Sequence, residues 1–134
     1  MANPTILYFE DDALSREVMR TCLTRGLGYQ NVTIFEDSSD FDTKIERLLS
    51  KPDVVFLDIH MEPINGFAML KLIRKNKVCQ STKVIALTAS VMNEEVKMLK
   101  DAGFDGVLAK PLDYDIFPNV LRRILNGEQV WHIR

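Results

Sequence analysis

The chain alternates between short apolar runs and longer stretches in which apolar residues recur every three or four positions. Five short runs, at residues 5–9, 32–35, 53–57, 83–87 and 106–109, are nearly continuously apolar. Such runs are typical of strands that are covered on both faces, as in a parallel sheet. The stretches between them have helical periodicity, and this alternation predicts an α/β domain. Short connections and right-handed crossovers then place five helices on both faces of a five-stranded parallel sheet.

Capping and breaking residues delimit the predicted helices. Asp12 is a suitable N-cap for the first helix, which Gly26 and Gly28 end. The later helices are expected after Gly66, over residues 93–102 and over residues 114–125, where a proline at position 118 falls in the first turn or so. The second and third helices are expected to turn apolar side chains inward, namely Phe41, Ile45, Leu48, Leu49, Phe67, Met69, Leu70 and Ile73.

Length and composition favour one globular domain. The 134 residues suit one core, which we place at residues 1–126, with 127–134 as a short tail and no second domain. A net charge of -2 gives no reason to expect nucleic-acid binding, and no apolar run approaches the roughly 20 residues of a membrane span. No signal peptide is evident, and Cys22 and Cys79 match no metal spacing. We therefore expect a cytoplasmic protein with reduced thiols.

Polar residues stand where four of the predicted strands end. The first strand is followed by Glu10 and Asp11, the third by Asp58, the fourth by Thr88 and the fifth by Lys110. Parallel strands end at the same edge of a sheet, so these side chains should converge. Two like charges ~4 Å apart cost about 4 kcal/mol at an effective dielectric near 20. Either one carboxyl keeps a proton or a cation lies among them, and an all-oxygen site suits Mg²⁺.

Phosphoryl transfer is a reaction that needs carboxylates, a hydroxyl and an ammonium around one point. Its transition state spreads negative charge over three equatorial oxygens, which the protein must position and neutralise. Magnesium, the Lys110 ammonium and the Thr88 hydroxyl could each take one oxygen. Asp58, central in the sheet, is then the natural nucleophile, since carboxylates form acyl phosphates.

Each of these signals has a simpler alternative. Residues 10–12 could be only the start of a helix, Thr88 could be an N-cap, and Lys110 could be a solvated surface residue. Their joint appearance, in order and each at a strand end, favours the phosphoryl-transfer hypothesis.

These motifs resemble the receiver domain of bacterial two-component response regulators, over about residues 5–125. Residues 6–12 are similar to the family's first strand and acidic pair, and residues 58–61 to its phosphoacceptor motif, with Gly66 at the family's spacing. Thr88-Ala89 resembles the switch residue with its small neighbour. Lys110-Pro111 resembles the lysine–proline pair, whose peptide bond is usually cis in the family.

The resemblance implies a flavodoxin-like fold with strand order 2-1-3-4-5. It implies that a sensor histidine kinase or a phosphotransfer protein phosphorylates Asp58. Mg²⁺ would be bound directly by Asp11, Asp58 and the backbone carbonyl of His60, and through a water by Glu10.

Within the resemblance, Thr88 would turn toward the phosphoryl group and Lys110 would hold it. The chain would be a single-domain receiver that signals through a separate downstream protein or a phosphorelay, as a monomer or a phosphorylation-dependent homodimer. It would catalyse only its own phosphoryl transfer and dephosphorylation, with no direct nucleic-acid or membrane partner.

The chain departs from the family at several positions. Glu62 stands where proline often follows the methionine, and Pro63 comes after it. Val107 replaces the aromatic that commonly rotates inward with the switch residue. His60 and Ser90 stand at the two positions that tune dephosphorylation in the family.

Other functions and the tail remain open. A phosphorylation-independent interaction module and a phosphohydrolase of the haloacid-dehalogenase type are the alternatives, the second disfavoured because its acidic pair comes late in the chain. Val107, Phe117 or Val120 could form an apolar contact face, although Phe117 and Val120 are better explained as core. The tail residues 130–133, Val-Trp-His-Ile, could pack back, contact a partner or stay mobile.

Overall fold

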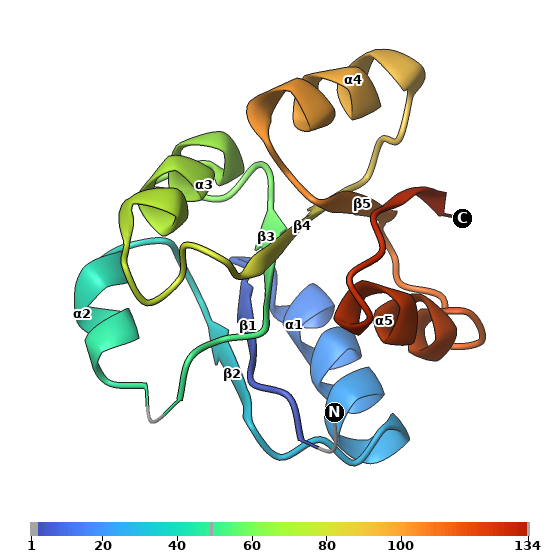
Figure 1. Cartoon of the computed structure of the whole chain (residues 1–134). Helices are drawn as coiled ribbons and strands as arrows, with labels where there is room; N and C mark the ends of the chain where they lie inside the picture. The colour runs from blue at the N-terminus through green and yellow to red at the C-terminus, as the bar shows by residue number, and fades with distance from the viewer. Residues whose placement is uncertain (1–2, 49, 134) are drawn as a thin grey trace.

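The computed structural model describes residues 3–48 and 50–133 (Figure 1), so the predicted inward position of Leu49 lies outside it. The strands are β1 Ile6–Phe9, β2 Val32–Phe35, β3 Val54–Asp58, β4 Lys83–Thr88, β5 Gly106–Ala109 and β6 Val130–Ile133. The helices are α1 Ala13–Arg20, which continues as the π-helical η1 Thr21–Gly26, α2 Phe41–Glu46, α3 Gly66–Lys75, α4 Asn93–Ala102 and α5 Phe117–Leu125.

The strands form one parallel sheet in the order β2-β1-β3-β4-β5-β6. The predicted flavodoxin-like order 2-1-3-4-5 is therefore confirmed. The predicted count of five strands is one short, because residues 130–133 of the expected tail pair with β5. β1, β3 and nearly all of β4 are buried, as expected for central strands with both faces covered.

Two hydrophobic clusters lie on opposite faces of the sheet. One joins inward residues of the strands to α2, α3 and α4, among them Phe41, Met69 and Leu99. The other joins the alternate strand residues to α1, η1 and α5. Phe117 and Val120 are buried in this second cluster and Val107 in the first, so these three residues do not form the exposed apolar face considered above. Helices cover both faces of the sheet, as predicted (Figure 1).

The last helix begins later than predicted. The amide of Asp115 donates to the Asp113 side chain, and the amides of Ile116 and Phe117 donate to the Asp113 carbonyl. This local turn satisfies the backbone in place of a first helical turn, so α5 starts at Phe117 rather than near 114. Pro118 occupies the first turn, where proline was expected.

A glycine allows β6 to lie against β5. A Cβ on Gly106 would come within 2.6 Å of the Val130 carbonyl oxygen. Val130 is 1% exposed, and Trp131 packs partly buried against the cluster on the α4 side of the sheet. Of the three possibilities for the tail, the structure shows that Val130 and Trp131 pack back on the domain.

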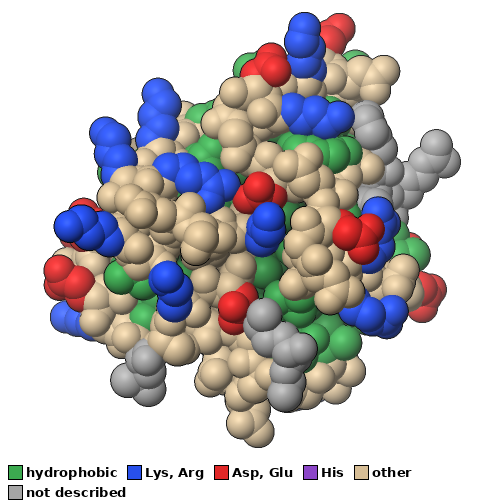
Figure 2. Space-filling view, viewed as in Figure 1, with side chains coloured by type: hydrophobic (Ala, Val, Ile, Leu, Met, Phe, Trp, Pro, Cys, Tyr) green, Lys and Arg blue, Asp and Glu red, His purple; other side chains and the backbone are tan. Residues whose placement is uncertain are grey.

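The predicted cap of the first helix agrees with the structure, whereas α2 ends at Glu46, before the expected helical residue Leu48. The Asp12 side chain accepts from the amide of Ser15 and caps α1. Cys22 and Cys79 are buried and free. Within the described ranges, no helix is long and apolar enough to span a membrane. Basic and acidic side chains both occur across the face that Figure 2 shows.

Gly66 permits a close contact behind the end of β3 that gives a first prediction. A Cβ there would lie 2.8 Å from Ile59 Cδ1 and 2.9 Å from Ile59 Cα. We expect Gly66→Ala to lower the free energy of unfolding by about 1–3 kcal/mol, measured by urea denaturation, because backbone must shift to relieve the clash. Gly26→Ala is the control, since its Cβ would meet only the Thr21 oxygen at 3.6 Å. Equal losses in both variants would contradict the packing argument.

Candidate functional site

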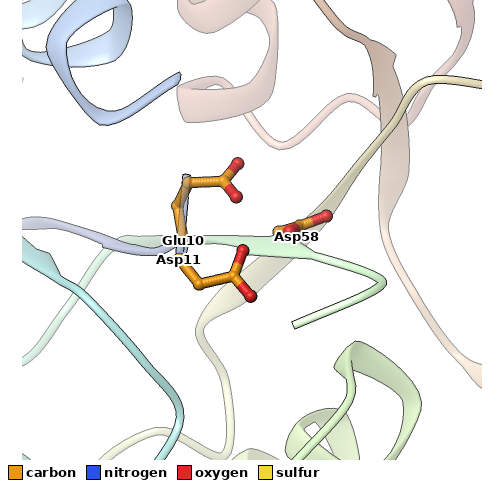
Figure 3. A group of neighbouring side chains, drawn as sticks. All are labelled: Glu10, Asp11 and Asp58. Carbon is orange, nitrogen blue, oxygen red and sulfur yellow. The ribbon is translucent and has the colours of Figure 1, made fainter. Parts of the chain in front are cut away.

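Three carboxylates meet at the carboxyl ends of β1 and β3. Glu10, Asp11 and Asp58 each offer an oxygen, and these oxygens all lie within 4.8 Å of one another (Figure 3). Glu10 and Asp58 are buried, whereas Asp11 is exposed. The convergence follows from the register, which pairs Phe9 at the end of β1 with Leu57 just before Asp58. The sequence-based expectation that these residues gather at one edge is therefore correct.

Lys110 reaches the same point from the end of β5. Its Nζ lies 2.7 Å from Glu10 Oε1 and 3.5 Å from Asp58 Oδ1. Its backbone amide donates to the Thr88 carbonyl, and the Lys110–Pro111 peptide bond is cis, as the resemblance implies. The alternative that Lys110 is a solvated surface residue is therefore wrong.

A buried tyrosine also holds Glu10, and the sequence analysis missed it. The Tyr8 hydroxyl donates to Glu10 Oε1 at 2.6 Å, and the Glu10 side chain is completely buried. Residues two apart on a strand share a face, so the placement of Tyr8 two before Glu10 was the available signal. Asp12 caps α1, but Glu10 and Asp11 lie in the carboxylate cluster, so the alternative that residues 10–12 are only a helix start is also wrong.

Burial and crowding shift the ionisation of these groups. Burial raises the pKa of the Glu10 carboxyl and the neighbouring Asp58 raises it further, while contacts with Lys110 and Tyr8 oppose the rise without cancelling it. Burial disfavours the Lys110 ammonium, but the carboxylates of Glu10 and Asp58 outweigh this effect and raise its pKa. Burial and the Glu10 carboxylate likewise raise the pKa of the Tyr8 hydroxyl. Lys110 is therefore a cation and Tyr8 a hydrogen-bond donor at neutral pH.

The loop after β3 folds around Asp58. The His60 amide donates to Asp58 Oδ1 at 3.3 Å, and the Gly66 amide donates to the Ile59 carbonyl. The His60 side chain is exposed, as expected for a loop residue. The metal-binding role of its backbone carbonyl stays a prediction.

A serine from another loop fixes the unusual part of this segment. The buried Ser38 hydroxyl accepts from the Ile64 amide at 2.7 Å, and the Glu62–Pro63 peptide bond is cis. Pro63, which stands one position later than the proline common in the family, therefore lies in a loop whose backbone Ser38 holds in place. Sequence reasoning identified residues 36–39 only as a polar turn, since the two segments are 26 positions apart.

Thr88 ends β4 and is buried, with 2% of its surface exposed. Its hydroxyl accepts a hydrogen bond from the Ser90 amide at 3.2 Å. The N-cap of α4 is Met92, so the alternative that Thr88 is a helix cap is wrong. Its hydroxyl is engaged with its own loop and free to donate its proton elsewhere.

The sequence was also compared with known proteins. The sequence model of one protein family, the response regulator receiver domain, matches residues 6–122. This chain belongs to the response regulator receiver domain family.

The nitrate/nitrite response regulator protein homolog of Haemophilus influenzae is 34% identical over 93% of this chain, which covers 58% of that protein. The osmosensing histidine protein kinase SLN1 of Saccharomyces cerevisiae is 28% identical over 80% of this chain, which covers 9% of it. The chain thus spans less than two thirds of these relatives.

Solved structures share the fold. The chemotaxis response regulator CheY4 of Vibrio cholerae superposes with a TM-score of 0.79 at 24% identity, covering 91% of this chain and 98% of that one. A receiver domain of a sensor histidine kinase from Pseudomonas aeruginosa has magnesium coordinated in its active site cleft. It superposes with a TM-score of 0.78 at 26% identity, covering 92% of this chain and 98% of that one.

The carboxylate cluster of this receiver domain fits Mg²⁺. Three carboxylates against one ammonium leave two negative charges, which a divalent cation would balance. The donors are hard oxygens, and Asp11 is exposed, so water can complete the coordination shell. Asp11 and Asp58 would bind the ion directly, with Glu10 behind them.

This fit predicts stabilisation by the metal. We expect Mg²⁺ to raise the free energy of unfolding by about 1.4 kcal/mol for each tenfold excess over Kd, and the thermal midpoint with it. We expect Asp11→Asn to reduce this rise. The ion binds ionised carboxylates, so the effect should be present above the raised pKa of Glu10 and be lost as the pH falls through it. Differential scanning fluorimetry at matched ionic strength is the measurement.

The matched control is Asp101→Asn, an exposed carboxylate on α4. It should shift with Mg²⁺ as the wild type does. An equal rise in the Asp11→Asn protein would argue against the proposed ligand set.

Proposed function

We propose that this protein is a phosphorylation-dependent signalling receiver in which Asp58 accepts a phosphoryl group in a Mg²⁺-dependent reaction. The observation that supports this most directly is the Lys110 ammonium 3.5 Å from Asp58 Oδ1, beside a carboxylate cluster suited to a cation. A carboxylate that is merely structural would need no second and third acid beside it.

In the proposed reaction, an Asp58 oxygen attacks phosphorus and forms an acyl phosphate, while the bond between phosphorus and the donor breaks. The leaving group takes the bonding electron pair. Lys110 binds one phosphoryl oxygen. Mg²⁺ held by Asp11 and Asp58 would supply further charge neutralisation. Thr88 donates its hydroxyl proton to another phosphoryl oxygen, which requires its side chain to turn away from the Ser90 amide.

The donor, by this proposal, is a sensor histidine kinase or a phosphotransfer protein. The relative in Saccharomyces cerevisiae is itself named as a histidine protein kinase, which supports that class of partner. We place the protein in the cytoplasm and expect output through a separate protein or a phosphorelay, from a monomer or a phosphorylation-dependent dimer. It turns over no external substrate.

Incubation with acetyl phosphate and Mg²⁺, read by intact mass, tests the proposal. We expect a gain of one phosphoryl group in the wild type and no gain in Asp58→Asn or after chelation of the metal. Asp101→Asn should be phosphorylated like the wild type, because it lies on α4, outside the carboxylate cluster.

Failure to gain mass with acetyl phosphate, phosphoramidate and a histidine-phosphorylated donor would overturn the proposal in favour of a phosphorylation-independent module. Sustained release of phosphate from a phosphomonoester, lost in Asp58→Asn, would instead indicate a phosphohydrolase.

A further inference from the structure

The outer edge of β5 is occupied by a strand from the same chain. β6 pairs with it in parallel, with Gly106 opposite Val130. The two side chains next to each other in β6 lie in different layers. Val130 is buried in the cluster on the α5 side, and Trp131 packs on the cluster on the α4 side.

This edge has the features of a site for an extended peptide. Gly106 removes the side chain that would otherwise collide with the incoming backbone. Lys100 of α4 lies over the Trp131 ring, with Nζ 5.1 Å from the ring centroid, which is a cation–π distance. Backbone pairing, a slot for an aliphatic residue and a cation for an aromatic one together define which segment fits.

The helix that supplies Lys100 is held in the core by Val96 and Leu99, but one of its flanks borders a cavity. A cavity of about 130 Å³ lies between α4, the start of α3 and the ends of β3 and β4, lined among others by Phe67, Met98 and Thr88. The helix therefore has space to move, and Thr88 borders that space.

The phosphorylation site and β6 can therefore be coupled through α4. When the Thr88 hydroxyl donates to a phosphoryl group, its side chain leaves the Ser90 amide that holds the loop to α4. A shift of α4 into the cavity then separates Lys100 from Trp131 and weakens the hold on β6.

We propose that the β5 edge is a strand-docking site that β6 occupies within the same chain, and that phosphorylation of Asp58 releases β6. The freed edge then accepts an extended segment of the downstream partner, with an aliphatic residue opposite Gly106 followed by an aromatic residue against Lys100. This inference rests on the proposed phosphorylation of Asp58.

The chain has one tryptophan, so Trp131 reports on β6 without labelling. We expect phosphorylation to shift its emission to the red and to raise acrylamide quenching at least about twofold, with the phosphorylated fraction read by intact mass in the same sample. Amide hydrogen exchange over residues 130–133 should rise in parallel. Thr88→Ala should lose these responses when compared at an equal phosphorylated fraction, and Thr88→Ser should retain them.

The coupling must be reciprocal. Lys100→Ala removes the cation from Trp131, so it should increase quenching in the unphosphorylated chain. It should also tighten binding of beryllium trifluoride, a phosphoryl mimic, by about two- to fivefold. Lys97→Ala is the matched control, because Lys97 is exposed on the same helix.

A peptide with the sequence of residues 128–134 carrying Trp131→Phe tests the edge itself. It should compete with β6 in the phosphorylated protein and expose Trp131 further, whereas a scrambled peptide should not. Full phosphorylation with unchanged tryptophan emission and exchange would overturn release of β6, and no effect of the peptide would overturn the docking site. An absence of phosphorylation would instead refute the proposed function.

Discussion

The buried ion pair between Glu10 and Lys110 is the interaction on which the polar edge of this receiver domain depends. Glu10 is fully enclosed, and Lys110 is its one close cation among the ion pairs of the described residues. Leaving one member of such a pair alone costs about 3–5 kcal/mol. The pair joins the ends of β1 and β5 across the intervening β3 and β4. The Tyr8 hydroxyl and the Asp12 amide also donate to the Glu10 carboxylate, and Asp58 lies beside Lys110.

The sheet and the covering elements have different mechanical roles. β1 and β3 are buried on both faces and hold the carboxylates at fixed spacing, which the proposed phosphoryl transfer requires. α4 is different, since it borders a cavity and exposes Met92 at its N-cap and Met98 on its surface. A rigid site beside a helix with space along one flank is the arrangement that the proposed coupling requires, in which a local change in charge becomes a change in surface shape.

β6 completes this arrangement by covering a sheet edge. An open edge presents unpaired amides and carbonyls to any extended chain, and proteins commonly cover it. Here the cover is a strand of four residues that is attached through a turn with Gly127 in the left-handed region. As an edge strand it pairs with β5 alone, which makes it suited to exchange with a partner segment.

The sequence by itself determined the alternation of strands and helices, and therefore the convergence of Asp11, Asp58, Thr88 and Lys110. Each of these follows a run with strong periodicity, and a parallel sheet brings such ends together whatever the details of packing. Only the tertiary structure decided the contacts between distant segments that have no local signal. Gly106 against Val130, and Ser38 with Ile64, are of this kind. The local pattern of apolar residues indicates which face of an element is buried, whereas the residue that each side chain contacts depends on how the whole chain packs.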